Sequence, residues 1–145
     1  MDMLKRQLAR FNHIMQGIEK FYEIYAKSAG LTCMSLTVLE ILYHAESPCT
    51  QKEICGFSHY NKQVVNTIVK SFYQKGYVEF CAVLDDRRNK HVLLTESGKQ
   101  YADKIMEPLM EIEEKALSVL SDDERLAMLE MLERCYNGYK RYFPE

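Results

Sequence analysis

The chain has 145 residues, of which 47% are hydrophobic and 28% are charged, as is ordinary for one globular domain with a sizeable core. No apolar run approaches the ~20 residues that span a bilayer, and the N-terminal segment lacks the apolar stretch of a signal peptide. We therefore expect a cytoplasmic protein with no membrane segment. The net charge of −2 is unlike that of a simple basic nucleic-acid-binding protein.

Charge is distributed unevenly along the chain. Residues 1–49 are neutral overall, residues 50–100 carry a net charge of +3, and residues 101–145 carry a net charge of −5. If the chain binds a polyanion, residues 50–100 are therefore the segment that binds it.

The five cysteines are scattered and match neither the close pairs of a zinc site nor a redox C-x-x-C motif. We interpret them as reduced thiols that pack as small hydrophobic groups. A thiol sensor is the alternative, and Cys33 is then the first candidate. The histidines lack metal-ligand spacing, and the sequence has no paired acids, nucleophile motif or phosphate-binding loop. We therefore expect no metal, no cofactor and no catalytic residues: the protein is not an enzyme.

Two helices are predicted in the first third of the chain. Apolar residues at three- and four-residue steps predict a helix from Leu4 to about Ser28, which ends near Gly30. A shorter helix follows, with Ser35 as its cap, and it ends before Ser47-Pro48 because the residue before a proline disfavours helix.

Two further helices are predicted between residues 50 and 76. The segment Thr50–Glu53 reads as a capping box, and it opens a short helix that Gly56 and the polar residues after it interrupt. Asn61 is a suitable cap for a second helix over Lys62–Lys75, which ends at Gly76.

After Gly76 the apolar period changes from 3.6 to 2, which predicts a two-stranded hairpin. Its charged turn spans residues 85–90, and Thr95 then caps the next helix. The strand residues expected to face inward are Val78, Phe80, Ala82, Val92 and Leu94.

The last third is predicted to be helical, and Ser121–Glu124 forms a second capping box. The final helix carries its large apolar residues on one side: Leu126, Leu129, Leu132, Tyr136, Tyr139 and Phe143. Together with Tyr142, these aromatic residues exceed what an exposed monomer tail would carry, so we expect this helix and the first one to form a dimer. The alternative is that both apolar stripes pack within their own domain.

Two consecutive helices, followed at once by a hairpin with a basic tip, describe a winged helix-turn-helix, in a fold that is mainly α (α+β). A helix fits the DNA major groove, where Gln and Asn can pair with adenine, and a cationic wing can contact phosphates or a narrow minor groove. Helix N-termini can also bind phosphate. The candidate DNA-binding residues are Thr50, Ser58, Asn61, Lys62, Gln63, Asn66, Thr67, Lys70, Arg87, Arg88, Asn89 and Lys90.

Two segments resemble the MarR family of transcription regulators. Residues Asp86–Gly98 match the family's wing signature, D-x-R-x-x-x-V-x-L-T-x-x-G, at every fixed position. Residues Phe72–Val78 resemble the end of the family's recognition helix. Asn66-Thr67 stand where the family often has Thr-Arg, so the target sequence of the family cannot be carried over.

The resemblance implies a single bacterial domain over residues 1–145, in which about 1–30 and 101–145 form long dimerisation helices and about 33–100 form the winged helix lobe. It implies a homodimer that binds a pseudo-palindromic operator in double-stranded DNA, as a repressor of nearby genes relieved by a small ligand. A small aromatic ligand would lie in a crevice lined by aromatics such as Phe11 and Tyr22. The alternative is a winged helix module that docks on a protein and binds DNA weakly or not at all, and the negative net charge supports it.

Overall fold

The computed structural model describes residues 2–83 and 86–144, except that the side chains of residues 83–89 lie outside the description. The elements are α1 (Met3–Ser28), α2 (Cys33–His44), β1 (Cys49–Thr50), α3 (Gln51–Ser58), α4 (Lys62–Gln74), β2 (Val78–Val83), β3 (Asp86–Leu94), α5 (Glu96–Leu117) and α6 (Asp122–Tyr142). The chain divides into two compact units, Met1–Met106 and Glu107–Glu145. The predicted fold class, mainly α with a winged helix-turn-helix, is confirmed.

Four of the predicted helix starts have the expected caps, and that of α5 is Thr95. The Thr50 hydroxyl accepts a hydrogen bond from the Glu53 amide, and the Glu53 carboxylate accepts one from the Thr50 amide at 2.8 Å. Ser121 and Glu124 form the same reciprocal pair. The Asn61 side chain accepts from the Val64 amide at 2.9 Å. Because each cap satisfies amides that the helix itself leaves unpaired, these short sequence patterns determine where the helices begin.

Two predicted boundaries were wrong. Thr32 rather than Ser35 caps α2, because the hydroxyl of Thr32 accepts from the Ser35 amide at 3.1 Å. Gly56 does not interrupt α3, which continues to Ser58. The helix ends there because His59 has a left-handed backbone, with φ of 60°, a conformation that His tolerates better than most residues.

The sheet has three antiparallel strands in the order β1-β3-β2, one more than predicted. The additional strand, β1, pairs Cys49 with Val92 at the root of the hairpin. Val78, Val92 and Leu94 are buried as expected. Ala82 is exposed, contrary to the prediction, because the hairpin has by then extended beyond the elements that cover its root.

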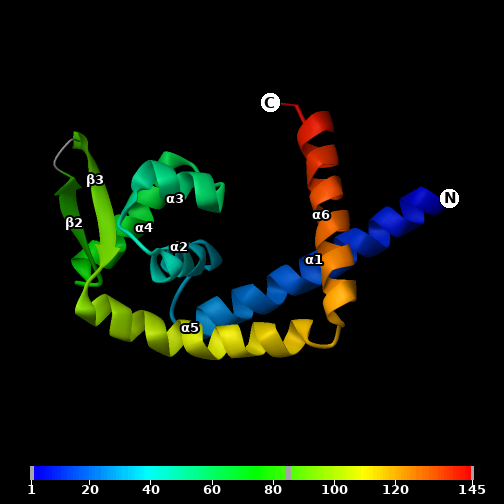
Figure 1. Cartoon of the computed structure of the whole chain (residues 1–145), viewed down its shortest axis with the longest axis horizontal. Helices are drawn as coiled ribbons and strands as arrows, with labels where there is room; N and C mark the ends of the chain where they lie inside the picture. Colours follow the sequence, from blue (N-terminus) through cyan, green and yellow to red (C-terminus); the bar gives the residue numbers. More distant parts are fainter. Residues whose placement is uncertain (1, 84–85, 145) are drawn as a thin grey trace. The chain divides into compact units, whose positions relative to one another are not determined.

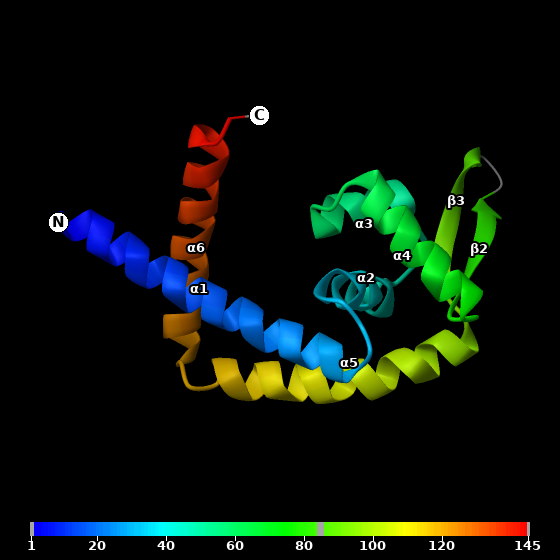
Figure 2. The same ribbon diagram turned by 180° about the vertical axis from the view of Figure 1, so that it is seen from behind.

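The core of the first unit is built around α2, which contacts α1, α3, α4 and β3. Figures 1 and 2 show α2 beside the paired helices α3 and α4, with the hairpin of β2 and β3 next to them. The largest fully buried side chains include Val38, Leu39, Ile54, Val65, Val69, Phe72 and Val92. Helix α4 is therefore held in place by its apolar face, which packs into this core.

The terminal helices bury little within the described chain. In α1 only Ala26 is buried, and none of the residues of α6, all of which the structure describes, is buried. Among the helices described, none is long and apolar enough to cross a membrane.

Candidate nucleic-acid interface

The turn between α3 and α4 is held by side-chain hydrogen bonds. Ser58 is buried, and its hydroxyl accepts from the Tyr60 amide at 3.1 Å. The Tyr60 hydroxyl donates to the hydroxyl of Thr37 on α2 at 3.1 Å, and Thr37 donates to the Cys33 carbonyl. The start of α4 is therefore tied to α2 as well as to α3.

Helix α4 has one buried face and one polar face. Its buried residues are Val65, Ile68, Val69 and Phe72. The opposite face is exposed and carries five predicted site residues: Lys62, Gln63, Asn66, Thr67 and Lys70. These positions recur at three- and four-residue steps, so their side chains emerge on one side of the helix.

The donors and acceptors on this face are compatible with base edges in a major groove. Gln63 and Asn66 carry amides that can pair with adenine, and Lys62 and Lys70 can reach guanine or phosphate. The Thr67 hydroxyl donates to the Gln63 carbonyl at 2.9 Å, so it is partly occupied within the helix.

The three remaining candidates in the helix-turn-helix have structural partners. The side chains of Thr50 and Asn61 cap α3 and α4, and Ser58 is buried in the turn. Their side chains stabilise the two helices, and a phosphate would meet the amides of the helix N-termini instead.

Lys90 is the one predicted wing residue whose side chain is described. It is exposed on β3, and its Nζ lies 5.8 Å from the centre of the Phe80 ring. The Phe80 ring in turn lies 5.2 Å from the ring of Tyr73 on α4. A Lys over an aromatic face is an attractive cation–π contact, so this cluster links α4 to the hairpin of β2 and β3. Sequence reasoning missed it because its members come from three elements.

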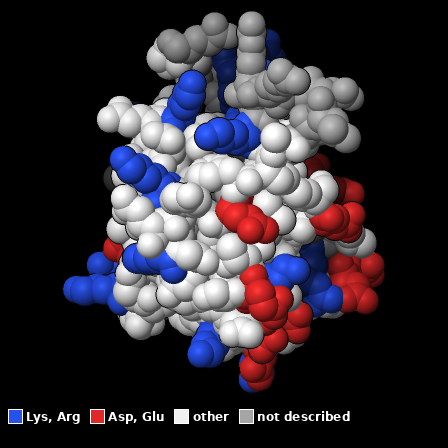
Figure 3. Space-filling model, turned by 90° about the vertical axis from the view of Figure 1, so that its left-hand side faces the viewer, with Lys and Arg blue, Asp and Glu red and all other residues white. Residues whose placement is uncertain are grey.

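The other predicted wing residues, Arg87, Arg88 and Asn89, have side chains outside the described residues. Figure 3 shows the side of the molecule on which β2 and β3 lie, with residues outside the description in grey. Lys and Arg side chains lie along the upper and left parts of this face, and most Asp and Glu side chains lie to the right and below. A phosphate backbone is attracted to the first part and repelled by the second.

The base of the wing is locked to α5 through the end of the signature segment. The Thr95 hydroxyl donates to the Gly76 carbonyl at 2.7 Å and accepts from the Gly98 amide at 2.9 Å, which caps α5 as predicted. A Cβ on Gly98 would stand 1.9 Å from the Tyr77 carbonyl oxygen. Only glycine fits there. The rings of Tyr77 and Tyr101 also stack, with centroids 4.0 Å apart.

Two thiols, the half-buried Cys33 and the buried Cys49, are poorly suited to redox sensing. Burial, with a contribution from Glu23 and Glu19, raises the pKa of Cys33 above its ordinary value. Burial and Glu53 likewise raise the pKa of Cys49. Because the thiolate is the reactive form, both cysteines are weak nucleophiles. Among the described residues, no group of three or more His, Cys, Asp or Glu is placed to hold a metal ion.

Sequence comparison identifies relatives of the helix-turn-helix region. Residues 29–89 match the sequence model of the MarR family. The HTH-type transcriptional regulator Hpr of Bacillus cytotoxicus is 28% identical over 94 residues, which make up 65% of this chain and 50% of Hpr. The chain thus spans about half the length of the curated relatives it matches.

Structure comparison extends the likeness over nearly the whole chain. A MarR family regulator from Neisseria meningitidis is 25% identical with a TM-score of 0.79, and the match covers 97% of this chain and 96% of that chain. A complex of Staphylococcus aureus MepR with DNA is 21% identical with a TM-score of 0.72, and covers 90% of this chain and 95% of that chain. The resemblance predicted from the signature Asp86–Gly98 is confirmed.

Proposed function

We propose that the protein is a transcriptional regulator of the MarR family, whose sequence model matches residues 29–89, and that it binds double-stranded DNA as a homodimer. The exposed polar face of α4 carries this proposal. It presents amide and ammonium groups at the start of a helix whose other face is buried. MepR, whose complex with DNA has a similar fold, supports it.

The two DNA-facing elements have different roles in the proposal. Helix α4 lies in the major groove, where Gln63 and Asn66 discriminate between bases. The wing, with Arg87, Arg88 and Lys90, contacts phosphates or the minor groove and supplies affinity for any sequence. The overall charge of −2 does not prevent this, because residues 50–100 carry a net charge of +3.

The homodimer is supported by the uncovered apolar residues of the terminal helices. Leu4, Leu8, Ile14 and Phe21 on α1 are exposed, as are Leu129, Leu132 and Tyr136 on α6. Apolar surface of this extent is typical of an interface. Two lobes related by a two-fold axis would meet half-sites about one helical turn apart.

We further propose that the protein represses nearby genes and that a small aromatic ligand relieves repression. The support is Phe11 and Tyr22, which lie half-buried on α1 and would line a crevice beside the DNA-binding lobe. A ligand releases DNA only if it binds the released conformation more tightly than the DNA-bound one.

The test compares two variants on a duplex selected from a random pool and on its scrambled counterpart. Asn66→Ala should cost about 1–3 kcal/mol on the selected duplex and little on the scrambled one. Arg88→Ala should weaken binding to both by a similar factor and reduce the slope of log K against log salt by about one. Lys104→Ala, which removes an exposed lysine from α5, is the matched control.

Fluorescence anisotropy at several salt concentrations measures all of these quantities. If Arg88→Ala leaves both affinity and salt slope unchanged, the wing does not contact DNA. If neither variant changes a weak, salt-insensitive association, the protein-docking alternative replaces the proposal.

A further inference from the structure

An aromatic and cationic cluster lies where α4 meets the hairpin, and it is formed by Tyr73 on α4, Phe80 on β2 and Lys90 on β3. The rings of Tyr73 and Phe80 are inclined at 39°, with centroids 5.2 Å apart. The Nζ of Lys90 lies 5.8 Å from the centre of the same Phe80 ring. The Phe80 ring therefore brings an ammonium group of the hairpin and a phenol of the helix into one cluster.

Tyr73 continues the polar face of α4 toward the hairpin. Asn66, Lys70 and Tyr73 follow one another at steps of four and three residues, so their side chains emerge on one side of the helix. At a rise of about 1.5 Å per residue, Tyr73 lies about 10 Å beyond Asn66 along the helix axis. Tyr73 is 54% exposed, whereas its neighbour Phe72 is buried. Tyr73 is therefore accessible to a molecule bound along the polar face.

The charges on the helix side of this cluster are positive. Helix α4 contains two lysines and no acidic residue. Because successive side chains of a strand point to opposite faces, Glu79 lies on the other face of the hairpin from Phe80. An anion beside Tyr73 is therefore attracted by Lys70 and Lys90 and meets no carboxylate from α4.

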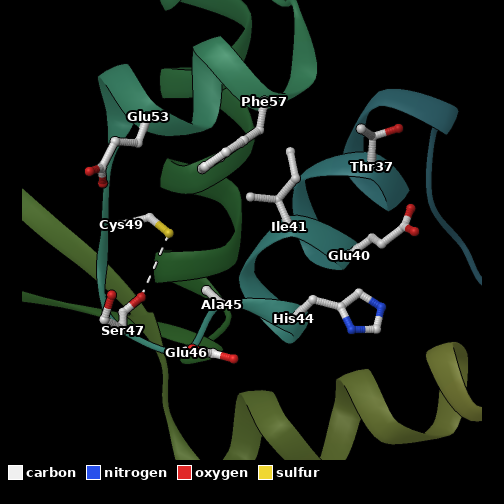
Figure 4. Close-up of a pocket in the computed structure, with 10 residues that line it drawn as sticks. All are labelled: Thr37, Glu40, Ile41, His44, Ala45, Glu46, Ser47, Cys49, Glu53 and Phe57. Carbon is white, nitrogen blue, oxygen red and sulfur yellow. Dashed lines mark hydrogen bonds between the residues drawn. The ribbon is translucent and has the colours of Figure 1, made fainter. Parts of the chain in front are cut away.

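The cavity between α2 and α3 has the opposite character (Figure 4). It has a volume of about 570 Å³, and its described lining includes Glu40, Glu46 and Glu53 but neither Lys nor Arg. A phosphate in that cavity would meet carboxylates without a lysine or arginine to neutralise it. Of these two places, the cluster at Tyr73 is therefore the one suited to a phosphate.

We propose that Tyr73 and Lys90 bind one phosphate of the DNA strand that borders the major groove, and that the Phe80 ring holds both side chains in position. This inference rests on the proposed binding of DNA by α4. A helix whose start contacts base edges reaches the edge of the groove further along its length, because the major groove is only about 12 Å wide. Tyrosine hydroxyls and lysine ammonium groups are common donors to phosphate oxygens.

Fluorescence anisotropy with the selected and the scrambled duplex, over a range of salt concentrations, tests the two donors separately. Tyr73→Phe removes only the hydroxyl and should weaken binding to both duplexes roughly tenfold, since a hydrogen bond to a charged group is lost. The salt slope of this variant should stay unchanged, because an uncharged hydroxyl releases no counterion. Lys90→Gln should weaken binding to both duplexes and reduce the slope of log K against log salt by about one.

The matched control is Tyr142→Phe, at an exposed tyrosine of α6 that has Arg141 over its ring. This variant loses the same hydroxyl outside the cluster and should bind both duplexes as the wild type does. Circular dichroism confirms that each variant folds.

The variant Phe80→Leu tests the positioning role of the ring. The substitution removes neither a charge nor a donor, so a role in packing alone would leave the salt slope unchanged. If Phe80 positions Lys90, the slope should fall in the same direction as in Lys90→Gln. An unchanged slope contradicts the role given to Phe80.

A set of selected duplexes, each with one phosphate replaced by an uncharged methylphosphonate, locates the contact. At one phosphate in each half-site, the loss of affinity measured with the wild type should be smaller with Tyr73→Phe and with Lys90→Gln. If the two variants lose sensitivity at different phosphates, the two donors do not share a phosphate and the proposal is overturned.

If Tyr73→Phe binds both duplexes as tightly as the wild type, the cluster serves only to pack the hairpin against α4. The inference is then wrong, whereas salt-dependent binding by the wild type still supports the proposed function. If the wild type itself shows no salt-dependent binding to either duplex, the proposed function fails and this inference fails with it.

Discussion

Helices α4 and α6, one from each compact unit, start in similar ways but end in different environments. Both have a side-chain cap, from Asn61 and from Ser121, and both carry an apolar stripe at helical spacing. Helix α4 buries Val65, Ile68, Val69 and Phe72, whereas α6, described along its whole length, buries no residue. The same local signals thus produce one helix whose apolar face is packed against other residues of the described chain and one whose apolar face is exposed.

The signals that form a helix are different from the contacts that bury its apolar face. Caps and periodicity act within a few residues, so they determine that a helix forms and which face is apolar. The residues that pack against the apolar face lie far away in the sequence or belong to another molecule. The open face of α6 is therefore the strongest support for a second copy of the chain.

The largest effect is expected from placing charge on the open face of α6. Leu129 is 53% exposed and Leu132 is 39% exposed. The double variant Leu129→Glu, Leu132→Glu should weaken dimerisation on the order of 100-fold or more, because carboxylates would have to be buried at the interface. Sedimentation equilibrium at low micromolar concentration measures it.

The control for this variant is Arg134→Gln, at an exposed position on the face of α6 opposite the apolar stripe, which should remain dimeric. A wild-type chain that sediments as a stable 17.0 kDa species would remove the dimer from the proposed function.

The second largest effect is expected on the free energy of unfolding, when a glycine is replaced by alanine in each of the two units. Gly98→Ala should lower the free energy of unfolding by about 3 kcal/mol, since its Cβ overlaps the Tyr77 carbonyl. Gly138→Ala in α6, where no atom lies within 4 Å of the new Cβ, should raise it by roughly 0.5–1 kcal/mol. Urea unfolding at equal protein concentration measures both.

If Gly98→Ala is as stable as the wild type, Gly98 does not pack closely against the Tyr77 carbonyl. If Gly138→Ala destabilises the protein, a second chain packs closely against that position.

A smaller effect is expected from Tyr25, whose hydroxyl donates to the Ile105 carbonyl at 2.6 Å. Tyr25→Phe should cost about 1 kcal/mol. Burial raises the pKa of Tyr25 above its ordinary value of 10.0, so the folded state keeps this proton at a pH where the unfolded chain loses it. Wild-type stability should therefore fall as the pH rises through 10, and less steeply in the variant.

Urea unfolding at pH 8, 9, 10 and 10.5 gives these slopes. Tyr101→Phe is the informative comparison, because burial and Tyr77 raise the pKa of Tyr101 in the same direction. Parallel slopes for wild type and Tyr25→Phe would show that the Tyr25 hydroxyl does not contribute to the loss.

The smallest effect concerns the thiols. Cys135 on α6 is exposed, whereas the raised pKa values of Cys33 and Cys49 leave little thiolate on either. Iodoacetamide should therefore modify Cys135 first, and mild peroxide should change DNA affinity less than about twofold. Mass spectrometry and a gel-shift assay measure the two outcomes. A large loss of binding that reductant reverses would instead support a sensor, with Cys33 tested first.

Much of the fold was predictable because its signals are local. The pairs Thr50 with Glu53 and Ser121 with Glu124 lie three residues apart, and each forms the predicted capping box. Strand β1 was not predictable from local pattern, because its two residues form a strand only by pairing with residues some forty positions later. Ala82 continued the alternation, yet exposure depends on neighbours that alternation does not specify.

The candidate site was predictable to a similar degree. The polar face of α4 follows from helical periodicity, and all five of its predicted residues are exposed. The buried position of Ser58 depends on a turn with a left-handed His59, which the residue types do not specify. Most described positions of the wing signature maintain the fold: Val92 and Leu94 are buried, Thr95 caps α5, and Gly98 admits no side chain.

The short strand β1 has a mechanical consequence for the wing. At His91 and Val92 the central strand β3 is paired on both edges, whereas Lys90 has a strand partner only in β2. The hairpin is therefore held most firmly at its root, where β3 has hydrogen-bonded neighbours on both sides. A DNA groove that bends the wing meets the greatest stiffness at these two residues, so the bend occurs from Lys90 outward and leaves the packing of α4 undisturbed.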